Sequence, residues 1–181
     1  FIGVPVGNQR PFDPGLVQMP NGQIRMYFSN GLNNPPSGGI DTYSGISNDG
    51  VTYTFEPTPR FGDATKHAID PTVAFYNGIY YYDSWSGVQS DGAFRAISTD
   101  ALTFTTQAVV PFDNSHLWLG NYLNDGSTLK FYGCGNSIWM NSSADGVTWG
   151  GFNNTNVGMG ADPAVVKTKN GTYLMIYTGP P

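Results

Sequence analysis

The chain has few charged residues, a single cysteine and a single glutamate, and each scarcity excludes a class of function. Charged residues make up 12% of the 181, with 8 Lys and Arg against 13 Asp and Glu and a net charge of −5. Nucleic-acid binding requires grouped basic side chains that neutralise phosphates, and no such group is present. Cys134 stands alone, so neither an intramolecular disulfide nor a cysteine-based metal site can form. We expect its thiol to be buried as a small hydrophobic group.

Long hydrophobic runs are also missing. No segment approaches the roughly 20 apolar residues that span a bilayer, so no membrane span is expected. The chain opens at Phe1 and is interpreted as mature, trimmed or a fragment. Its low charge and few lysines favour an extracellular or secreted location.

Turn-forming and aromatic residues are abundant instead. The chain contains 24 Gly and 13 Pro, and 14% of its residues are aromatic. Glycine and proline favour turns, whereas aromatic residues favour pleated strands. One turn dipeptide recurs between short apolar runs, as Asn21-Gly22, Asn77-Gly78, Asp125-Gly126 and Asn170-Gly171. This pattern predicts four β-hairpins with type I′ turns, which need positive φ at both central residues. A helical period is absent, so essentially no helix is expected.

A second signature follows each of the first three hairpins. It places Ser, then Asp two residues later, then Thr and an aromatic residue, in segments 47–53, 98–104 and 143–149. The Ser and Asp side chains can cap their own turn, and the aromatic residue begins the next strand. Each complete unit therefore contains two hairpins, or four antiparallel strands. Such units at spacings of tens of residues are typical of β-propeller blades.

The sequence thus predicts an all-β fold, a β-propeller of four repeated four-stranded antiparallel units in a single domain over residues 1–181. The units cover about 13–57, 70–110, 117–152, and 162–181 together with 1–8, so that the two termini share the last blade. The alternative is a fragment of a larger propeller. An incomplete blade would leave an edge through which the chain could form a homo-oligomer.

The blade-opening segments 13–28 and 162–179 resemble those of the five-bladed β-propeller glycoside hydrolase superfamily, which includes glycoside hydrolase family 43, the fructan-cleaving enzymes and the mannoside phosphorylases. The resemblance covers nearly the whole chain at the level of blades. The Ser-x-Asp segments are similar to the Asp-boxes of sialidases. This similarity implies a structural role in peripheral turns for Asp49, Asp100 and Asp145.

Three aspartates, Asp13, Asp70 and Asp162, occupy one equivalent place in their units, where each precedes a proline. If the inner strands line a central funnel, their side chains converge near its mouth. In the resembled enzymes an Asp at such a position is the catalytic base, a second Asp orients it, and a Glu is the acid. An inverting glycosidase needs two carboxyls about 6.5–9.5 Å apart. A purely structural role stays open, because Asp-Pro also initiates turns.

The third unit departs from the family pattern. Counting back from Gly126 reaches Leu117 and Trp118, so the equivalent place holds no carboxylate. The only glutamate, Glu56, follows the first Ser-x-Asp segment and is expected at the periphery. The acid glutamate of the family is therefore missing, which leaves open whether the chain is an enzyme.

Two histidines and two tryptophans are candidates for substrate binding. His67 and His116 stand at nearly the same place in consecutive units, and Trp118 and Trp85 could stack on a sugar. No cofactor is required, although a calcium ion in the funnel would suit the carboxylates better than zinc. The alternatives are surface histidines and aromatic packing between blades.

We therefore expect a carbohydrate-active, glycosidase-like propeller that hydrolyses or binds an oligo- or polysaccharide in its central funnel. Hydrolysis is placed slightly ahead of binding alone because the carboxylates align. The alternatives are a non-catalytic carbohydrate-binding propeller and an assembly module completed by strand exchange with neighbouring chains.

Overall fold

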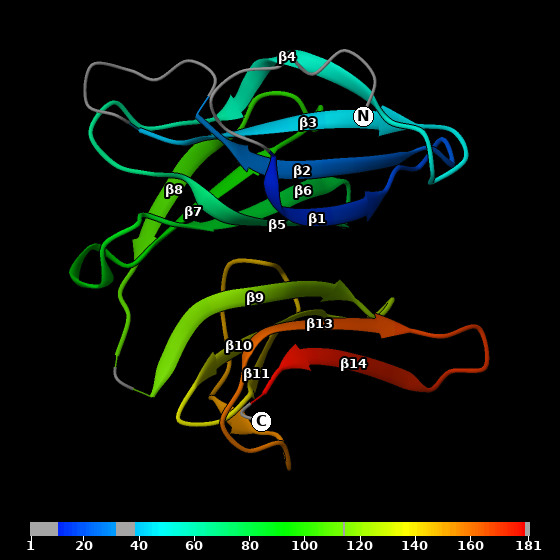
Figure 1. Ribbon diagram of the computed structural model, residues 1–181. Helices are drawn as coiled ribbons and strands as arrows, with labels where there is room; N and C mark the ends of the chain where they lie inside the picture. Colours follow the sequence, from blue (N-terminus) through cyan, green and yellow to red (C-terminus); the bar gives the residue numbers. More distant parts are fainter. Residues whose placement is uncertain (1–10, 32–38, 114, 180–181) are drawn as a thin grey trace.

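The computed structural model describes residues 11–31, 39–113 and 115–179, which form antiparallel sheets (Figure 1). The first sheet contains β1 (Phe12–Gln18), β2 (Ile24–Asn30), β3 (Asp41–Ser47) and β4 (Thr54–Phe61). The second contains β5 (Ile69–Tyr76), β6 (Ile79–Trp85), β7 (Ala93–Ser98) and β8 (Thr105–Val110). The third contains β9 (His116–Asn124), β10 (Leu129–Gly135), β11 (Trp139–Ser143) and β12 (Asn153–Asn154). The fourth pairs β13 (Ala161–Lys167) with β14 (Tyr173–Thr178).

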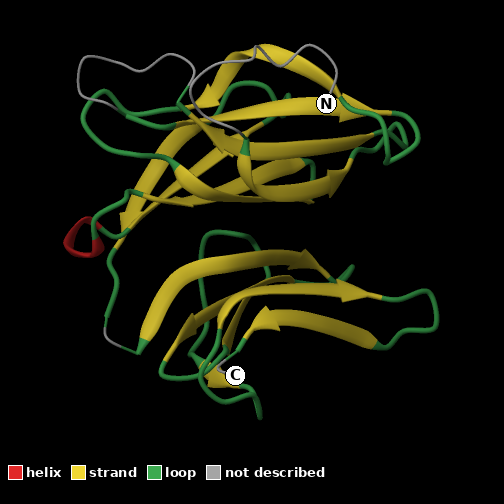
Figure 2. Ribbon diagram, in the orientation of Figure 1, coloured by secondary structure: helices red, strands yellow, loops and turns green. Residues whose placement is uncertain are grey.

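The predicted all-β propeller architecture is confirmed. Within the described ranges the helical content is one 3-10 turn, η1 (Gln89–Asp91), which Figure 2 shows beside the second sheet. None of the described helical structure is long and apolar enough to cross a membrane. The segment 1–8, which is predicted to complete the fourth blade, lies outside the described residues.

The first strand of each sheet lies at the centre of the molecule. β1 packs beside β5, β5 beside β9, and β9 beside β13, so the four inner strands follow one another around a common axis. β4, β8 and β12 are the outermost strands of their sheets. In Figure 1 the first two sheets lie above and the last two below, and the inner strands face the space between them.

Only one of the four hairpins has the predicted type I′ turn. Asn77 and Gly78 both have positive φ, at 49° and 83°. In the other three hairpins the glycine alone is left-handed, as at Gly22 with φ of 87°. There the turn is longer, because Gly22 N–H donates to the carbonyl of Met19. The dipeptide thus located every hairpin, whereas loop length decided the turn type.

The Ser-x-Asp segments cap their own turns as predicted. Asp100 Oδ1 accepts the N–H groups of Leu102 and Thr103 at 2.8 and 2.9 Å, and Ser98 Oγ donates to it at 2.8 Å. The segments around Asp49 and Asp145 repeat these bonds. Backbone N–H donors lower the pKa of the Asp49 carboxyl to about 2, which marks a carboxylate held for structure.

These turns also join neighbouring sheets. Tyr27 of the first sheet donates its hydroxyl to the carbonyl of Ala101, in the Ser-x-Asp turn of the second sheet, at 2.8 Å. Tyr81 of the second sheet donates to the carbonyl of Asp145, in the turn of the third, at 2.9 Å. Tyr27 is fully buried, so its hydroxyl satisfies a carbonyl that water cannot reach.

A buried ion pair lies between the second and third sheets. The Asp83 carboxylate is fully buried on β6, and Arg95 on β7 donates to it through two N–H groups at 3.0 and 2.7 Å. Tyr122 of the third sheet donates to the same carboxylate at 2.8 Å. The Arg95 guanidinium lies 4.5 Å above the ring of Trp118. A buried carboxylate is tolerated here because all of its partners are charged or hydrogen-bonding groups.

The fourth sheet is the least covered part of the described fold. Leu174 and Ile176 are 51% and 67% exposed on one face of β14. Within the described ranges no strand pairs with the outer edge of β14. An uncharged edge strand of this kind is a surface on which another strand could add.

Tyr27→Phe tests the connection between the first two sheets. Removing the hydroxyl leaves the Ala101 carbonyl without its partner, so we expect a loss of about 1 kcal/mol in the free energy of unfolding, measured by urea denaturation. Tyr80→Phe is the matched control, since its ring is also buried and no hydrogen bond of its hydroxyl to a described residue is found. Equal losses in both variants would show that the Tyr27 bond contributes nothing.

Candidate functional site

The start of each inner strand carries a backbone irregularity that directs a side chain toward the axis. In β1 the pairing with β2 shifts between Phe12 and Gly15, which leaves Asp13 and Pro14 as a bulge. The same shift surrounds Asp70-Pro71 in β5 and Asp162-Pro163 in β13. A bulge of this kind re-aims the side chain that it carries.

All three bulge aspartates have left-handed backbone conformations. Their φ angles are 52° at Asp13, 54° at Asp70 and 50° at Asp162. This region costs an L-residue roughly 1–2 kcal/mol, although Asp tolerates it better than most residues. Strain repeated at equivalent acidic residues is a reason to look for function there.

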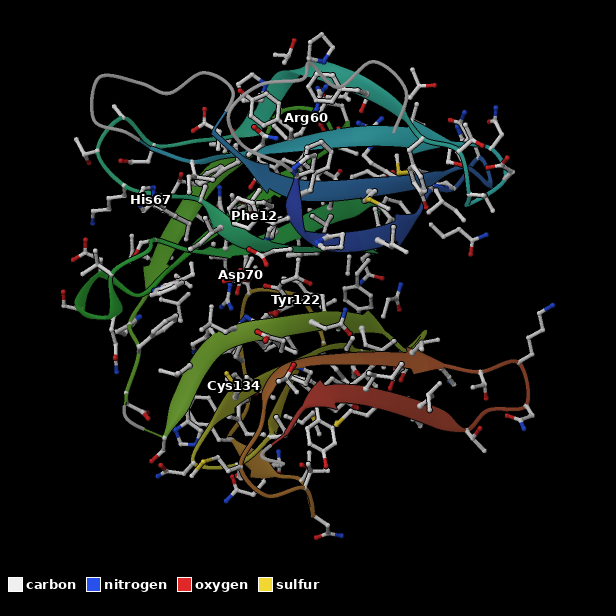
Figure 3. The ribbon with its side chains drawn as sticks, viewed as in Figure 1. Phe12, Arg60, His67, Asp70, Tyr122 and Cys134 are labelled. Carbon is white, nitrogen blue, oxygen red and sulfur yellow. The ribbon has the colours of Figure 1, made fainter. Side chains whose placement is uncertain are left out.

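The three aspartates surround one cavity of about 290 Å³ on the axis. Its walls are the Asp-Pro bulges of β1, β5 and β13 and the Gly120-Asn121 segment of β9. In Figure 3 Asp70 lies in the space between the upper and lower pairs of sheets. A second cavity, of about 440 Å³, lies at the opposite ends of the inner strands and is lined largely by apolar residues such as Val17, Val73 and Val165. The acidic chemistry is thus confined to one end of the axis.

β9 builds the fourth wall differently. Its pairing with β10 shifts between Leu117 and Gly120, and the bulge contains Trp118 and Leu119 in place of Asp-Pro. The positive φ falls on Gly120, at 151°. Asn121 then accepts the N–H of Val165 at 2.9 Å, which ties β9 to β13. The third unit therefore contributes backbone and an amide to the cavity, and no carboxylate.

Asp13 and Asp70 form a hydrogen-bonded carboxyl pair. Burial, the negative charge of Asp13 and the shared hydrogen bond raise the pKa of Asp70 to about 7. Burial also raises the pKa of Asp13, while its hydrogen bonds with Asp70 oppose that rise. The two carboxyls therefore titrate as a coupled pair, and Asp70 exchanges its proton near neutral pH. The charge of Asp162 raises the pKa of both groups, so it lies within electrostatic reach.

The four other candidate residues do not line this cavity. Trp118 is 6% exposed and packs on Phe131 and Trp139, because the β9 bulge directs its ring into the core of the third sheet. The sugar-stacking role expected for Trp118 is therefore replaced by packing. Trp85 is half-buried on β6, opposite Ile69.

Backbone and ring contacts position the two histidines. His67 Nδ1 accepts the N–H of Ile40 at 3.1 Å, which uses one ring nitrogen in structure. His116 stacks on Phe152 with ring centroids 3.8 Å apart, and its Nδ1 lies 3.0 Å from the Asp113 carboxylate. Phe152 is 43% exposed, so this stacked pair is accessible, although it does not line the axial cavity.

The chain's only glutamate does not lie where a catalytic acid would be expected. Glu56 lies on the outermost strand β4, where Arg25 donates to it at 2.7 Å and Arg60 lies 3.8 Å away. Figure 3 shows Arg60 in the outer part of the first sheet. In the described part of the chain no group of three His, Cys, Asp and Glu side chains is placed to hold a metal ion. The calcium ion considered from the sequence stays a prediction.

Several residues that shape the cavity were not identified from the sequence. Thr72 Oγ1 accepts the N–H of Tyr122 at 3.0 Å, and Ser29 Oγ accepts the N–H of Asp70 at 3.2 Å. The first bond links the inner strands β5 and β9, and the second links β2 of the first sheet to β5 of the second. In the sequence these two residues show only as polar residues at a fixed distance from a bulge. Their role becomes apparent once the strand register is known.

The fold is similar to solved structures of carbohydrate-active enzymes. An exo-β-1,3-galactanase from Phanerochaete chrysosporium matches with a TM-score of 0.73 at 12% identity, over 97% of this chain and 45% of that one. An endo-arabinase from Bacteroides thetaiotaomicron matches with 0.64 at 16% identity, over 96% and 72%. A fructofuranosidase from Schwanniomyces occidentalis matches with 0.66 at 15% identity, over 92% and 40%. At these identities the similarity establishes the propeller fold.

This chain spans less than half the length of the galactanase and of the fructofuranosidase. No protein-family model and no curated protein sequence matches it. Membership of glycoside hydrolase family 43 thus remains a prediction of the resemblance.

The carboxyl pair predicts how stability depends on pH. Because folding raises the pKa of Asp70, the folded chain holds a proton that the unfolded chain releases above about pH 4. Stability from this pair is fully present below that pH and is lost as pH rises through about 7. We expect the unfolding free energy to fall by up to about 1 kcal/mol per pH unit across this window, measured by urea denaturation.

Asp70→Asn should remove this slope, because an amide carries no titrating proton. Asp91→Asn is the matched control, since Asp91 lies on η1, away from the cavity, and pairs there with Lys66. If Asp70→Asn retains the wild-type slope, the shared proton does not exist.

Proposed function

We propose that this chain is a glycan-active propeller in which the axial cavity binds one sugar residue between the three aspartates. The observation that carries the proposal is the convergence of Asp13, Asp70 and Asp162 on one cavity, where the pKa of Asp70 is raised to about 7. Typical sites for larger ligands measure about 300–1,000 Å³. A cavity of about 290 Å³ therefore suits a single ring. Carboxyl groups suit its hydroxyls, and the proline rings in the walls suit its apolar faces.

Hydrolysis is the activity that we favour. Glycoside hydrolysis needs one protonated carboxyl to protonate the leaving group and one carboxylate to activate water. Asp70 meets the first requirement, since a pKa of about 7 is close to the optimum for a general acid at neutral pH. Asp13 is too close to Asp70 to leave room for the water, because their carboxyls are hydrogen-bonded. We therefore assign Asp13 to holding the proton on Asp70.

Asp162 is then the candidate base. β13 is separated from β5 by β9, so Asp162 approaches the cavity from a different wall than Asp70. Two carboxyls on separate walls are the arrangement that an inverting mechanism uses, because water must fit beside the sugar. This assignment replaces the family's glutamate acid with an aspartate, in agreement with the peripheral position of Glu56.

Binding without hydrolysis is the second candidate function. The feature that favours it is the fourth wall, where the Gly120-Asn121 segment supplies an amide and no carboxylate. Such a cavity could hold a sugar by hydrogen bonds alone. A third candidate, an assembly module, is favoured by the exposed face of β14 and by its outer edge, with which no strand of the described residues pairs.

Native mass spectrometry with β-1,3-galactotriose, arabinan oligosaccharides and fructosylnystose separates these functions. We expect cleavage products with the wild type, and intact glycan adducts without products for Asp70→Asn and Asp162→Asn. The loss in rate should be at least about 100-fold, as for removal of an acid or base. Asp91→Asn is the control that keeps wild-type activity.

Adducts without products in the wild type would assign the chain to binding alone. The absence of both adducts and products would contradict a glycan function, and a multi-subunit mass would then favour assembly through β14.

A further inference from the structure

One position recurs on the second strand of each sheet. This residue is the cross-strand partner of the inner-strand residue that stands directly before the bulge of the same sheet. In chain order this position holds Ser29, Trp85, Cys134 and Thr178. The register makes these four residues structurally equivalent, although their side chains differ.

Ser29 contacts the backbone of Asp70 in the following sheet. The Asp70 N–H donates to Ser29 Oγ at 3.2 Å, and Ser29 is fully buried. This N–H belongs to a bulge residue, so the β5–β6 pairing does not place it in a regular ladder. The Asp13 carboxylate also approaches it, which places the Asp70 backbone between two acceptors from the first sheet.

Cys134 repeats this relation between the third and fourth sheets. β10, which carries Cys134, packs against β13, which carries Asp162, and the Asp162 backbone lowers the pKa of the thiol. The Cys134 side chain is 4% exposed. In Figure 3 Cys134 lies among the strands of the lower half of the molecule, below Tyr122. Burial raises the pKa of the thiol, so a neutral, weakly accepting sulfur stands where the first sheet has a hydroxyl.

The second sheet supplies an internal comparison. Trp85 occupies the equivalent position there, and its ring nitrogen is a donor that cannot accept an N–H. The sheet that follows it carries Trp118 in its bulge and has no cavity aspartate. Residues able to accept thus precede the bulges of Asp70 and Asp162, and a non-acceptor precedes the bulge that holds Trp118.

We propose that Ser29 and Cys134 are positioning residues, which hold Asp70 and Asp162 at the axial cavity by accepting their backbone N–H groups. The left-handed φ of both aspartates is a strained conformation that needs an external partner to persist. Without the acceptor the bulge relaxes toward a regular strand and the carboxyl moves away from the cavity. The reason for holding these aspartates in place rests on the proposed function, whereas the contacts themselves do not depend on a bound glycan.

Carboxyl titration by NMR tests the Ser29 contact without a ligand. In the wild type we expect Asp70 to titrate with a midpoint of about 7. Ser29→Ala should move this midpoint down to about 5 or below, because Asp70 loses its contact with Asp13 and gains solvent. Ser29→Thr and Ser29→Val have the same shape, so they differ only in the hydroxyl. The Thr variant should keep the wild-type midpoint, and the Val variant should behave as Ser29→Ala does.

Ser84→Ala is the matched control for the loss of a buried serine on a second strand, since Ser84 Oγ accepts no aspartate N–H. It should leave the Asp70 midpoint unchanged. An unchanged midpoint in a folded Ser29→Val or Ser29→Ala variant would overturn the Ser29 assignment. A midpoint that moves while glycan binding is absent from every variant would retain the positioning role and remove the proposed function.

Amide hydrogen exchange tests Cys134 independently, and it stays informative if a Ser29 variant fails to fold. Cys134→Ala should accelerate exchange of the Asp162 amide by roughly tenfold, the effect of losing one hydrogen bond. Cys134→Ser restores an acceptor and should keep the exchange slow. Equal exchange rates in the Ala and Ser variants would overturn the Cys134 assignment.

Discussion

Neighbouring sheets of this chain are joined by polar side chains that hydrogen-bond backbone groups of the next sheet. At the periphery the Tyr27 and Tyr81 hydroxyls reach carbonyls of the Ser-x-Asp turns. Near the axis Thr72 and Asn121 accept N–H groups of the following inner strand. Side chains inserted between separate sheets must satisfy groups that water cannot reach, so each bond also fixes the angle between two sheets. The rest of the structure depends on this regular set of contacts.

The axial cavity is a consequence of that constraint. Inner strands held side by side bring their bulges to one end of the axis, where three of the four bulges direct an aspartate inward. The crowding of these aspartates in a half-buried space raises the pKa of Asp70 to about 7. The fold therefore brings carboxyls from three repeats together at one end of the axis, which is the arrangement that the proposed hydrolysis would use.

Much of the fold could be predicted from the sequence because its signals are local. Turn dipeptides located all four hairpins, and the Ser-x-Asp segments cap their turns as their side chains allow. The three Asp-Pro positions were found by their constant distance from the hairpin glycine. The contacts between sheets could not be predicted, since they join residues tens of positions apart whose register was unknown. Ser29 and the buried Asp83–Arg95 pair belong to this group.

Trp118 was considered for the funnel because its place in the sequence is equivalent to that of the bulge aspartates, but an equivalent place did not bring equivalent exposure. In β9 the bulge contains Trp118 and Leu119 in place of Asp-Pro, and Gly120 follows it. The Trp118 ring therefore enters the core, whereas the aspartates of the other bulges face the cavity. Exposure at a bulge depends on which of its residues takes the left-handed conformation. The residue pattern alone does not predict which residue of a bulge takes that conformation.

A crystal structure of the chain with β-1,3-galactotriose or an arabinan oligosaccharide tests the central claim most directly, namely that the axial cavity is the glycan site. The account predicts one sugar ring in the cavity, with its hydroxyls within hydrogen-bonding distance of Asp13, Asp70 and Asp162. A sugar bound instead to the exposed His116–Phe152 stack, with the axial cavity unchanged, would contradict it.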